Sequence, residues 1–251
     1  MDRAPDITVV VAAHNEELRL GRCLASLRAA AGARAVEIIV VDNRSTDDTA
    51  AVARAAGARV VVEPQLGAVN AKAAGVAAAG APLVAVLDAD SVCPVDWLDK
   101  IARAFAADAR LVGLSGPARY MGARPWVHVV MGSWYCFWKL VQTMAGTAYY
   151  AVGTNVAFRR DAYQRAGGFD TKVLVGGDEV GLFRRLRRVG LTRYTDELWV
   201  ETDPRRTEGG FLRFFFGTVL LHYVINYPIY RLTGHSLIKR YRPGSTLWPR
   251  Q

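Results

Sequence analysis

Residues 83–90 read LVAVLDAD, an apolar run that stops at two carboxylates one residue apart. Such a run predicts a buried strand that delivers acids to the edge of a sheet. Residues i and i+2 of an extended chain point to the same side, so Asp88 and Asp90 converge on one hard cation through oxygen ligands. The pattern predicts a metal–diphosphate site, against the alternative of a solvated turn after a strand.

The segments on either side of this run alternate between short β-branched runs and Ala-rich helical stretches. Leucines at 20, 24 and 27 share one helix face, and residues 45–47 offer capping groups to a helix that runs to Ala56. The alternation predicts an α/β fold with a mostly parallel central sheet flanked by helices. Its strands are almost wholly apolar, as strands covered on both faces are. They are predicted at residues 7–12, 37–41, 59–62, 83–87 and 111–115.

Composition sets the outer limits. A chain of 251 residues that is 51% hydrophobic fits one large domain, or one domain with an appendage. A formal net charge of +9 implies an anionic partner, and charge alone leaves nucleic acid, a phosphorylated small molecule and a lipid surface open. The three scattered cysteines indicate neither a disulfide framework nor a zinc site, so we expect reducing, cytoplasmic surroundings. We expect no secretion signal at the N-terminus.

Acid-bearing loops follow three of the predicted strands: residues 13–16 (AHNE), 42–47 (DNRSTD) and 88–90 (DAD). Ligands of parallel sheets gather at the carboxyl ends of the strands. Carboxylates there accept hydrogen bonds from a ribose or a base N–H, while Asp90 takes the cation that neutralises a diphosphate. Neither a Gly-x-Gly-x-x-Gly after the first strand nor a Walker sequence occurs, which disfavours dehydrogenases and P-loop NTPases.

These motifs, taken together, resemble the inverting family 2 glycosyltransferases of the GT-A fold. Each motif is weak alone, but together they run in the right order over roughly residues 7–206. The matching blocks are VVVAAHNE (9–16), VVD (40–42) with STD (45–47), residues 67–75, DAD (88–90), GTNVAFRR (153–160), GGFD (167–170), GDE (177–179), RL (185–186) and Gly190.

The resemblance implies three sets of site residues. Asp90 would ligate a divalent cation, Mn²⁺ or Mg²⁺, and Asp178 or Glu179 would be the catalytic base. Contacts to the nucleotide sugar would come from Ala13, Asn15, Glu16, Asp42, Lys72, Asp88 and Arg206, and contacts to the acceptor from Gly153, Thr154 and Asn155.

The chain also departs from the family pattern. Asn43 stands where many members have a second acid, and Ala73 where an Asn is common, which leaves the contacts to base and ribose undecided. The usual Glu-Asp pair is reversed as Asp178-Glu179. Family register favours Glu179 as the base and side-chain type favours Asp178. We favour Asp178, because the preceding glycines let its backbone approach the site and its shorter side chain has fewer torsions to fix. The alternative is that both acids only complement a helix dipole.

Two segments are unusually apolar. Residues 126–144 are rich in aromatic side chains, and residues 214–230 form an uncharged run between two arginines. The second run suits an interfacial helix, and from Glu201 onward eight Lys/Arg stand against three Asp/Glu, as anionic lipid headgroups favour. For 126–144 a buried helix is an equal alternative. The tract ending Asp203-Pro204-Arg205-Arg206 brings guanidinium groups toward a diphosphate, or is a solvated basic loop.

The sequence therefore predicts a metal-dependent, inverting transferase that moves a sugar from a nucleoside diphosphate to an acceptor, lipid-linked or close to a membrane. Residues 1–206 form the catalytic domain, with a nucleotide-binding half (1–117) and an acceptor-binding half (118–206), and 207–251 form a hydrophobic, basic tail. We expect a cytoplasmic protein, peripheral on the inner face of the cell membrane, with no nucleic-acid partner.

Two alternatives stay open. A nucleotidyltransferase that makes a sugar nucleotide would need a Gly-rich, basic phosphate loop directly after the first strand, where this chain has His14-Asn15-Glu16. A non-catalytic, membrane-associated binding protein on a degenerate transferase scaffold is kept open by Ala73 and the reversed acid pair.

Overall fold

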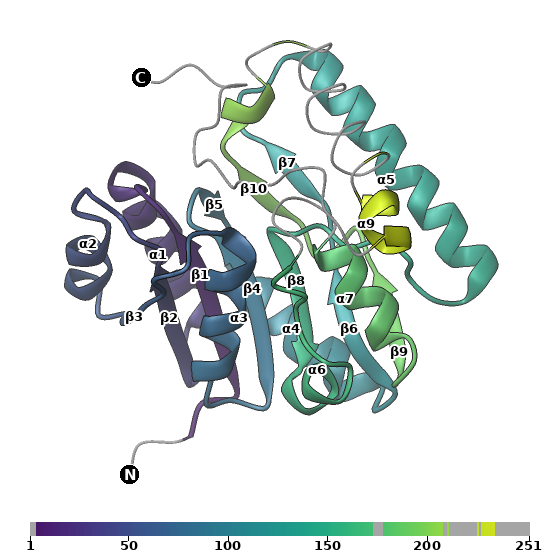
Figure 1. Cartoon of the computed structure of the whole chain (residues 1–251), viewed down its shortest axis with the longest axis horizontal. Coiled ribbons are helices and arrows are strands. Elements are labelled where there is room, and N and C mark those ends of the chain that lie inside the picture. The colour runs from purple at the N-terminus through teal and green to yellow at the C-terminus, as the bar shows by residue number, and fades with distance from the viewer. Residues whose placement is uncertain (1–3, 173–177, 208–209, 211–224, 226, 234–251) are drawn as a thin grey trace.

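The structure is a computed structural model that describes residues 4–172, 178–207, 210, 225 and 227–233. A seven-stranded sheet dominates it, in the order β3-β2-β1-β4-β8-β6-β9, and Figure 1 shows the strands in this order from left to right. Neighbouring strands are parallel, except that β8 runs antiparallel to both β4 and β6. The strands are β1 (Ile7–Ala13), β2 (Val36–Asp42), β3 (Arg59–Val62), β4 (Leu83–Asp88), β6 (Leu111–Ser115), β8 (Asn155–Arg159) and β9 (Leu191–Tyr194).

A small second sheet begins directly after the central strand. It has the order β5-β10-β7, with β5 at Ser91–Val92, β7 at Ala118–Tyr120 and β10 at Val200–Thr202. Because β4 ends at Asp88 and β5 begins at Ser91, the residues between them lie where the two sheets meet. Asp90 is thereby fixed between two hydrogen-bonded strands and is only 8% exposed.

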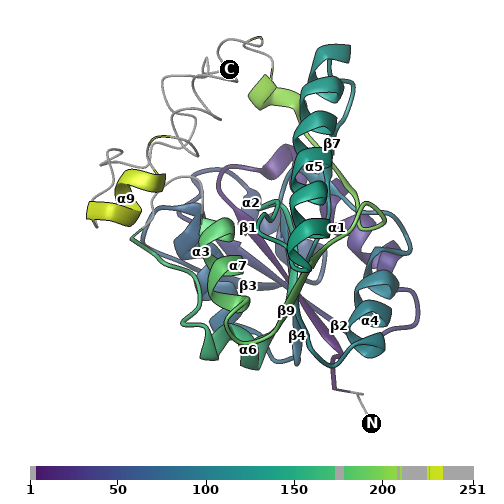
Figure 2. The same cartoon turned by 90° about the vertical axis from the view of Figure 1, so that its right-hand side faces the viewer.

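Helices cover both faces of the large sheet. Figure 2 shows α3, α6 and α7 on one side and α1 and α4 on the other. On the first side α3 lies very close to the strands, since a Cβ added to Gly75 would come within 2.3 Å of Val10 and 2.9 Å of Val41. The helices are α1 (Glu17–Ala31), α2 (Thr49–Ala55), α3 (Ala68–Ala78), α4 (Trp97–Ala107), α5 (Pro125–Ala145), α6 (Arg160–Arg165), α7 (Asp178–Leu186), the 3₁₀ helix η1 (Pro204–Thr207) and α9 (Tyr227–Thr233).

The predicted fold class is confirmed. All five predicted strands are present with ends within one residue of the prediction, and the leucine stripe of α1 is buried. The predicted capping groups at residues 45–47 do not supply the N-cap, because the N-cap of α2 is Asp48, which makes no side-chain cap hydrogen bond. Asp47, one residue earlier, accepts the backbone N–H of Thr49 (3.1 Å). The core consists of the apolar strand residues and the helix faces against them, including the fully buried Trp97, Phe158 and Phe183.

The aromatic segment 126–144 lies within α5, which is packed on one face only. Val127 and Tyr135 are buried, and Trp138 stacks on Tyr150 with ring centroids 5.5 Å apart. Four apolar side chains of α5 stay exposed: Val129, Phe137, Leu140 and Met144. Helix α5 thus packs against the core along one face and exposes apolar side chains elsewhere.

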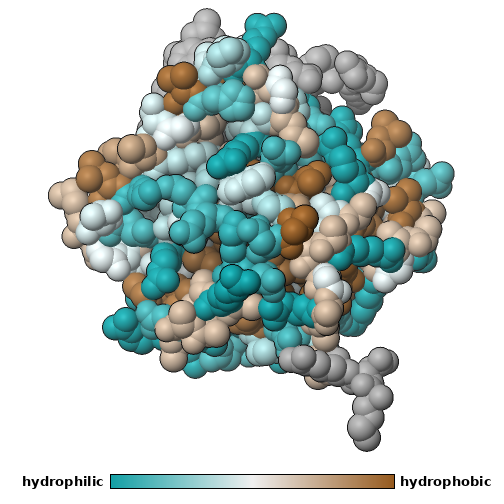
Figure 3. All heavy atoms as spheres, turned by 180° about the vertical axis from the view of Figure 1, so that it is seen from behind, coloured by the Kyte–Doolittle hydropathy of each residue, from teal (hydrophilic) through white to brown (hydrophobic). Residues whose placement is uncertain are grey.

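The back of the molecule has a surface of mixed hydropathy. Figure 3 shows the face opposite to that of Figure 1 as a mosaic of hydrophilic and hydrophobic residues. Among the described residues, no helix combines the length and the apolar character that crossing a membrane requires. Most of the apolar run 214–230, and of the predicted tail 207–251, lies outside the described residues.

Candidate active site

Three acid-bearing loops meet at one edge of the large sheet. The parallel register pairs Ala13 of β1 with Asp42 of β2, and Ala12 of β1 with Asp88 of β4. The carboxyl ends of the three strands are therefore level, and Glu16 follows from the end of β1. The structure thus brings together the acids that the sequence places after separate strands.

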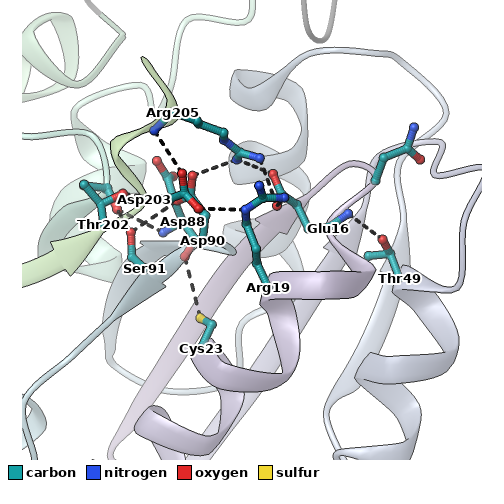
Figure 4. A network of polar contacts seen from close by, with 12 residues as sticks. Glu16, Arg19, Cys23, Thr49, Asp88, Asp90, Ser91, Thr202, Asp203 and Arg205 are labelled. Atoms are coloured by element: carbon teal, nitrogen blue, oxygen red, sulfur yellow. Dashed lines mark hydrogen bonds and ion pairs between the residues drawn. The ribbon is translucent and has the colours of Figure 1, made fainter. Parts of the chain in front are cut away.

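A guanidinium group lies between two of these acids. Arg205 of η1 donates through Nη2 to Asp90 Oδ2 (2.7 Å) and to Glu16 Oε1, and through Nη1 to Glu16 Oε2 (3.3 Å) (Figure 4). The other carboxylate oxygen of Asp90 accepts from Thr202 Oγ1 (3.3 Å) and Ser91 Oγ (3.4 Å). We call Glu16, Asp90 and Arg205 the diphosphate cluster, after the ligand that the sequence predicts there.

A second ring of contacts holds this cluster in place. Asp203 accepts the backbone N–H of Arg205 at Oδ1 (2.9 Å) and Arg19 Nε at Oδ2 (2.8 Å), so α1 is tied to the start of η1. Burial works to raise the pKa of Asp203, but these hydrogen bonds lower it below its ordinary value. Burial raises the pKa of Glu16, against the opposing effect of Arg205.

The candidate catalytic acids form a second, more deeply buried cluster. Lys72 of α3 donates through Nζ to Glu179 Oε1 (2.5 Å) and more weakly to Asp178 Oδ2 (3.5 Å) at the start of α7. Each of the three side chains is only 6% exposed. We call Lys72, Asp178 and Glu179 the base cluster, after the role that the sequence predicts for one of its acids. Residues 176 and 177, the glycines expected to bring the base toward its substrate, lie outside the described residues.

One cation cannot neutralise both acids of the base cluster. Burial, together with the charge of Glu179, raises the pKa of Asp178 to about 7. Burial also works to raise the pKa of Glu179, but the Lys72 ammonium lowers it below its ordinary value. The pKa of Lys72 is raised by both carboxylates, although burial opposes this. Glu179 is thus the closer partner of Lys72, and Asp178 is the carboxyl whose pKa is raised.

The predicted acceptor residues lie between the two clusters and mostly contact protein groups. A Cβ on Gly153 would fall 2.0 Å from Glu179 Oε1, so only glycine leaves room for that carboxylate. Thr154 Oγ1 accepts the backbone N–H of Asp88 (3.3 Å) and shares a hydrogen bond with Ser91 Oγ (2.8 Å). Asn155 is fully buried, and its side chain bonds Trp97 Nε1 and the carbonyl oxygens of Pro117 and Leu198.

The loops after β1 and β2 are held by short polar contacts. Asn15, at a positive φ of 54°, accepts the Thr46 N–H at its side-chain oxygen (2.8 Å), and Asp42 accepts the Ser45 N–H (3.0 Å). Asn43 has a structural use. Its amide donates to the carbonyl oxygens of Glu63 (3.0 Å) and Gln65 (2.8 Å), which an aspartate could not do.

Sequence reasoning missed several members of the site. It assigned Arg206 to the donor, whereas the guanidinium between the acids is that of Arg205, and the side chain of Arg206 lies outside the described part of the chain. Arg19, Thr202 and Asp203 were not singled out as site residues. The run of charges at residues 203–206 was the available signal, but it does not specify that Arg205 contacts Asp90.

The donor atoms of the diphosphate cluster suit a hard divalent cation. Asp90 and Glu16 offer carboxylate oxygens, which Mg²⁺ and Mn²⁺ prefer. In the described part of the chain, no group of three or more His, Cys, Asp or Glu side chains is arranged to hold a metal. The carboxylates of Asp90 and Glu16 therefore fit such a cation as part of its ligand set.

Comparison with known proteins adds independent findings. The model of glycosyl transferase family 2 matches residues 8–167. An uncharacterized glycosyltransferase of Mycobacterium tuberculosis is 37% identical over 182 residues, which cover 70% of this chain and 80% of that protein.

Two solved structures share the fold at lower identity. The mannosyltransferase PcManGT from Pyrobaculum calidifontis, in complex with GDP-Man and Mn²⁺, superposes with a TM-score of 0.65 at 21% identity, over 86% of this chain and 64% of that one. Glucosyl-3-phosphoglycerate synthase from Mycobacterium tuberculosis, in complex with Mn²⁺, UDP and phosphoglyceric acid, superposes with a TM-score of 0.54 at 22% identity, over 76% of this chain and 68% of that one.

Proposed function

The chain belongs to glycosyl transferase family 2, and we propose that it moves a sugar, with inversion at C1, from a nucleoside diphosphate sugar to an acceptor hydroxyl. The observation that carries this proposal is the base cluster. A buried carboxyl with a pKa of about 7 lies on α7, close to the sheet edge where three acid-bearing loops end. A general base works best when its pKa is near the working pH.

The donor would lie along the acid edge. Asp42, Asn15 and the backbone of Ala13 would face the nucleoside, and Asp88 and Asp90 the ribose and diphosphate. A divalent cation held by Asp90 would neutralise charge on the diphosphate as it leaves. The PcManGT and glucosyl-3-phosphoglycerate synthase complexes contain Mn²⁺ with a nucleotide or nucleotide sugar, which supports this use of the site.

The acceptor would approach from the side of the base cluster. Asp178 takes the proton of the acceptor hydroxyl while that oxygen attacks C1, and the bond from C1 to the diphosphate breaks. Glu179 stays paired with Lys72 and holds the start of α7. In this scheme Lys72 serves the base and not the nucleotide. Gly153 and Thr154 would lie between the donor and Asp178, and the buried Asn155 holds this segment in place through its side-chain hydrogen bonds.

We further propose that residues 1–117 form the donor half and 118–206 the acceptor half, and that the enzyme works at a membrane surface on a lipid-linked or membrane-proximal acceptor. The exposed Phe137, Leu140 and Met144 of α5 support this, as does the basic tail beyond Arg206. Such a protein would be cytoplasmic and peripheral on the inner face of the cell membrane.

Attachment has its own test, cosedimentation with anionic vesicles. Truncation after Arg206 should release the protein, and added salt should weaken binding of the intact chain because the basic component is screened. Sedimentation that is indifferent to both changes would rule out the membrane role and leave the transferase proposal intact.

The transfer proposal is tested by incubating the protein with UDP- and GDP-sugars, with and without Mn²⁺, and following release of the nucleoside diphosphate. One donor should give cation-dependent hydrolysis, and the sugar first released should have the anomeric configuration opposite to that of the donor. A nucleotide sugar that raises the melting temperature identifies the nucleobase that the protein prefers, since ligands that bind only the folded state stabilise it. Release of the sugar with retained configuration would contradict inversion, and lack of hydrolysis with every donor would contradict the transferase proposal.

A further inference from the structure

The diphosphate cluster already contains a cation of its own. The Arg205 guanidinium touches Glu16 through both of its terminal nitrogens, and one of these nitrogens also bonds Asp90 Oδ2 at 2.7 Å (Figure 4). A divalent cation bound to Asp90 would need an oxygen of the same carboxylate. Guanidinium and metal ion therefore compete for one ligand.

We propose that Arg205 is the resident cation of the diphosphate subsite. In the enzyme without donor it neutralises Asp90 and Glu16, and it yields Asp90 to the divalent cation that arrives with the nucleotide. The freed guanidinium then donates to the diphosphate. This inference rests on the proposed function, because it assumes a metal–diphosphate ligand at Asp90.

The backbone of Arg205 and its guanidinium are held by different acids. Asp203 holds the Arg205 backbone N–H (2.9 Å) and is itself tied to Arg19 (2.8 Å), so the turn of η1 is anchored independently of the guanidinium. The Arg205 side chain is 35% exposed, against 9% for Asp90 and 11% for Glu16. The cation of this cluster is thus its most accessible member, and the acids are the fixed ones.

Asp90 is built to exchange one partner and keep the others. Its Oδ1 accepts hydroxyl groups of Thr202 and Ser91, and only Oδ2 accepts from Arg205. When Arg205 leaves, one oxygen becomes available and the carboxylate keeps its orientation. A planar guanidinium also suits two oxygens of a phosphate as well as it suits a carboxylate.

Competition can be measured without nucleotide or sugar. Titration of Mn²⁺ alone, followed by the electron paramagnetic resonance signal of free Mn²⁺, gives its affinity for the wild-type chain and for Arg205→Gln. The variant should bind Mn²⁺ about tenfold more tightly, since a bound competitor has been removed from Asp90. A change that only damaged the structure would weaken Mn²⁺ binding, so the sign of the effect is diagnostic.

Arg22→Gln is the matched control. It removes the same charge from α1, where Arg22 is exposed and belongs neither to the diphosphate cluster nor to the contacts described above that hold it. Its Mn²⁺ affinity should stay within about threefold of the wild type, as screening of an exposed charge implies. Equal tightening in both arginine variants would reduce the effect to general electrostatics and overturn the proposal.

Two further variants complete the test. Adding Asp90→Asn to Arg205→Gln should abolish the gain in Mn²⁺ affinity, which locates the gain at Asp90. Arg205→Lys, which keeps the charge but loses the fork, should tighten Mn²⁺ binding less than Arg205→Gln, and it serves as the test if the glutamine variant does not fold. Unchanged Mn²⁺ affinity in the folded arginine variants would overturn the proposal, whereas failure of the proposed function would appear separately, as no donor hydrolysis by the wild type.

Discussion

Two clusters in this molecule have the same composition and opposite settings. In each, one basic side chain from a distant part of the sequence bridges two carboxylates: Lys72 between Asp178 and Glu179, and Arg205 between Glu16 and Asp90. The Lys72 side chain is 6% exposed and that of Arg205 is 35% exposed. The base cluster is therefore sealed, in the sense that its cation is buried. The cation of the diphosphate cluster is partly exposed to solvent.

The difference shows how burial assigns a role to an ion pair. A buried ammonium cannot leave its carboxylates without stranding charges away from water, so Lys72 is a permanent part of the structure. A guanidinium at the surface loses little when it changes partners, so Arg205 can be replaced by another cation. Sealed charges set the proton affinity of a base, and open charges exchange with ligands.

The largest expected effect is on catalysis, and it separates the two clusters by kind. Asp178→Asn should lower the rate of transfer by about 10²–10⁴, because loss of a general base typically costs that much. Its affinity for the nucleoside diphosphate should stay within a few-fold of the wild type, since the base contacts the acceptor. Steady-state kinetics and calorimetry measure the two quantities.

Asp90→Asn is the comparison variant for that experiment. It should weaken cation-dependent binding of the nucleoside diphosphate and leave the chain folded. If Asp178→Asn transfers sugar at the wild-type rate, the base is not Asp178, and Glu179→Gln then decides whether it lies in the base cluster at all. If Asp90→Asn binds the nucleotide with unchanged dependence on Mn²⁺, the metal site is wrongly placed.

The second prediction compares the two cations directly. Lys72→Met leaves two buried carboxylates without their partner, and removal of one member of a buried ion pair costs about 3–5 kcal/mol of the free energy of unfolding. Arg205→Met should cost less, about 1–3 kcal/mol, because its guanidinium is 35% exposed and water can replace it beside Glu16 and Asp90. Chemical denaturation of the two variants measures the difference. Equal losses would mean that the diphosphate cluster is as sealed as the base cluster.

The positions at which the strands end could be predicted from the sequence. The side chains that contact one another at those ends could not. Apolar runs ending at Asp42 and Asp88 carry their own evidence, because the length of a buried strand and the register of a parallel sheet determine where its acids emerge. The antiparallel β8 has no such local signal, since its pairing with β4 and β6 joins segments far apart in the chain.

Contacts between distant residues were out of reach for the same reason. Lys72 and Glu179 are 107 positions apart, and only the packing of α3 and α7 on one face of the sheet brings them within 2.5 Å. The contact of Arg205 with Asp90, 115 positions away, depends on the phase of a single 3₁₀ turn, which sequence composition does not encode. Asn43, which the family pattern marks as a departure, turned out to hold neighbouring loops through its two amide hydrogens.

The third prediction concerns pH. The pKa of Asp178 is about 7 in the folded chain and near 3.9 in an unfolded one, so the folded state holds this proton more tightly. The stabilisation is complete below about pH 4 and is lost as the pH rises to about 7, at a slope of at most about 1.4 kcal/mol per pH unit. Asp178→Asn should remove this slope from the free energy of unfolding.

Glu179 acts in the opposite direction and in a more acidic range. Its pKa is lowered, so its contribution is present above its unfolded value and is lost as the pH falls through its folded value. The free energies of unfolding of wild type and Asp178→Asn, measured between pH 4 and pH 8, should therefore change with pH at different slopes only below about pH 7. Parallel curves over the whole range would show that Asp178 is ionised throughout, and that Lys72 neutralises both carboxylates.

The smallest expected effect tests how tightly the base cluster is sealed. Gly153→Ala places a methyl group 2.0 Å from Glu179 Oε1, so Glu179 must shift away from Lys72 or the backbone must move. Overpacking of this kind costs about 1–3 kcal/mol. Gly132→Ala is the matched control, because Gly132 lies in α5 with nothing within 4 Å of its added Cβ. There the same methyl group should stabilise the helix by about 0.5–1 kcal/mol. Opposite signs in thermal denaturation would show that the space beside Glu179 is filled, and a neutral Gly153→Ala would mean that the base cluster has room to rearrange as the diphosphate cluster does.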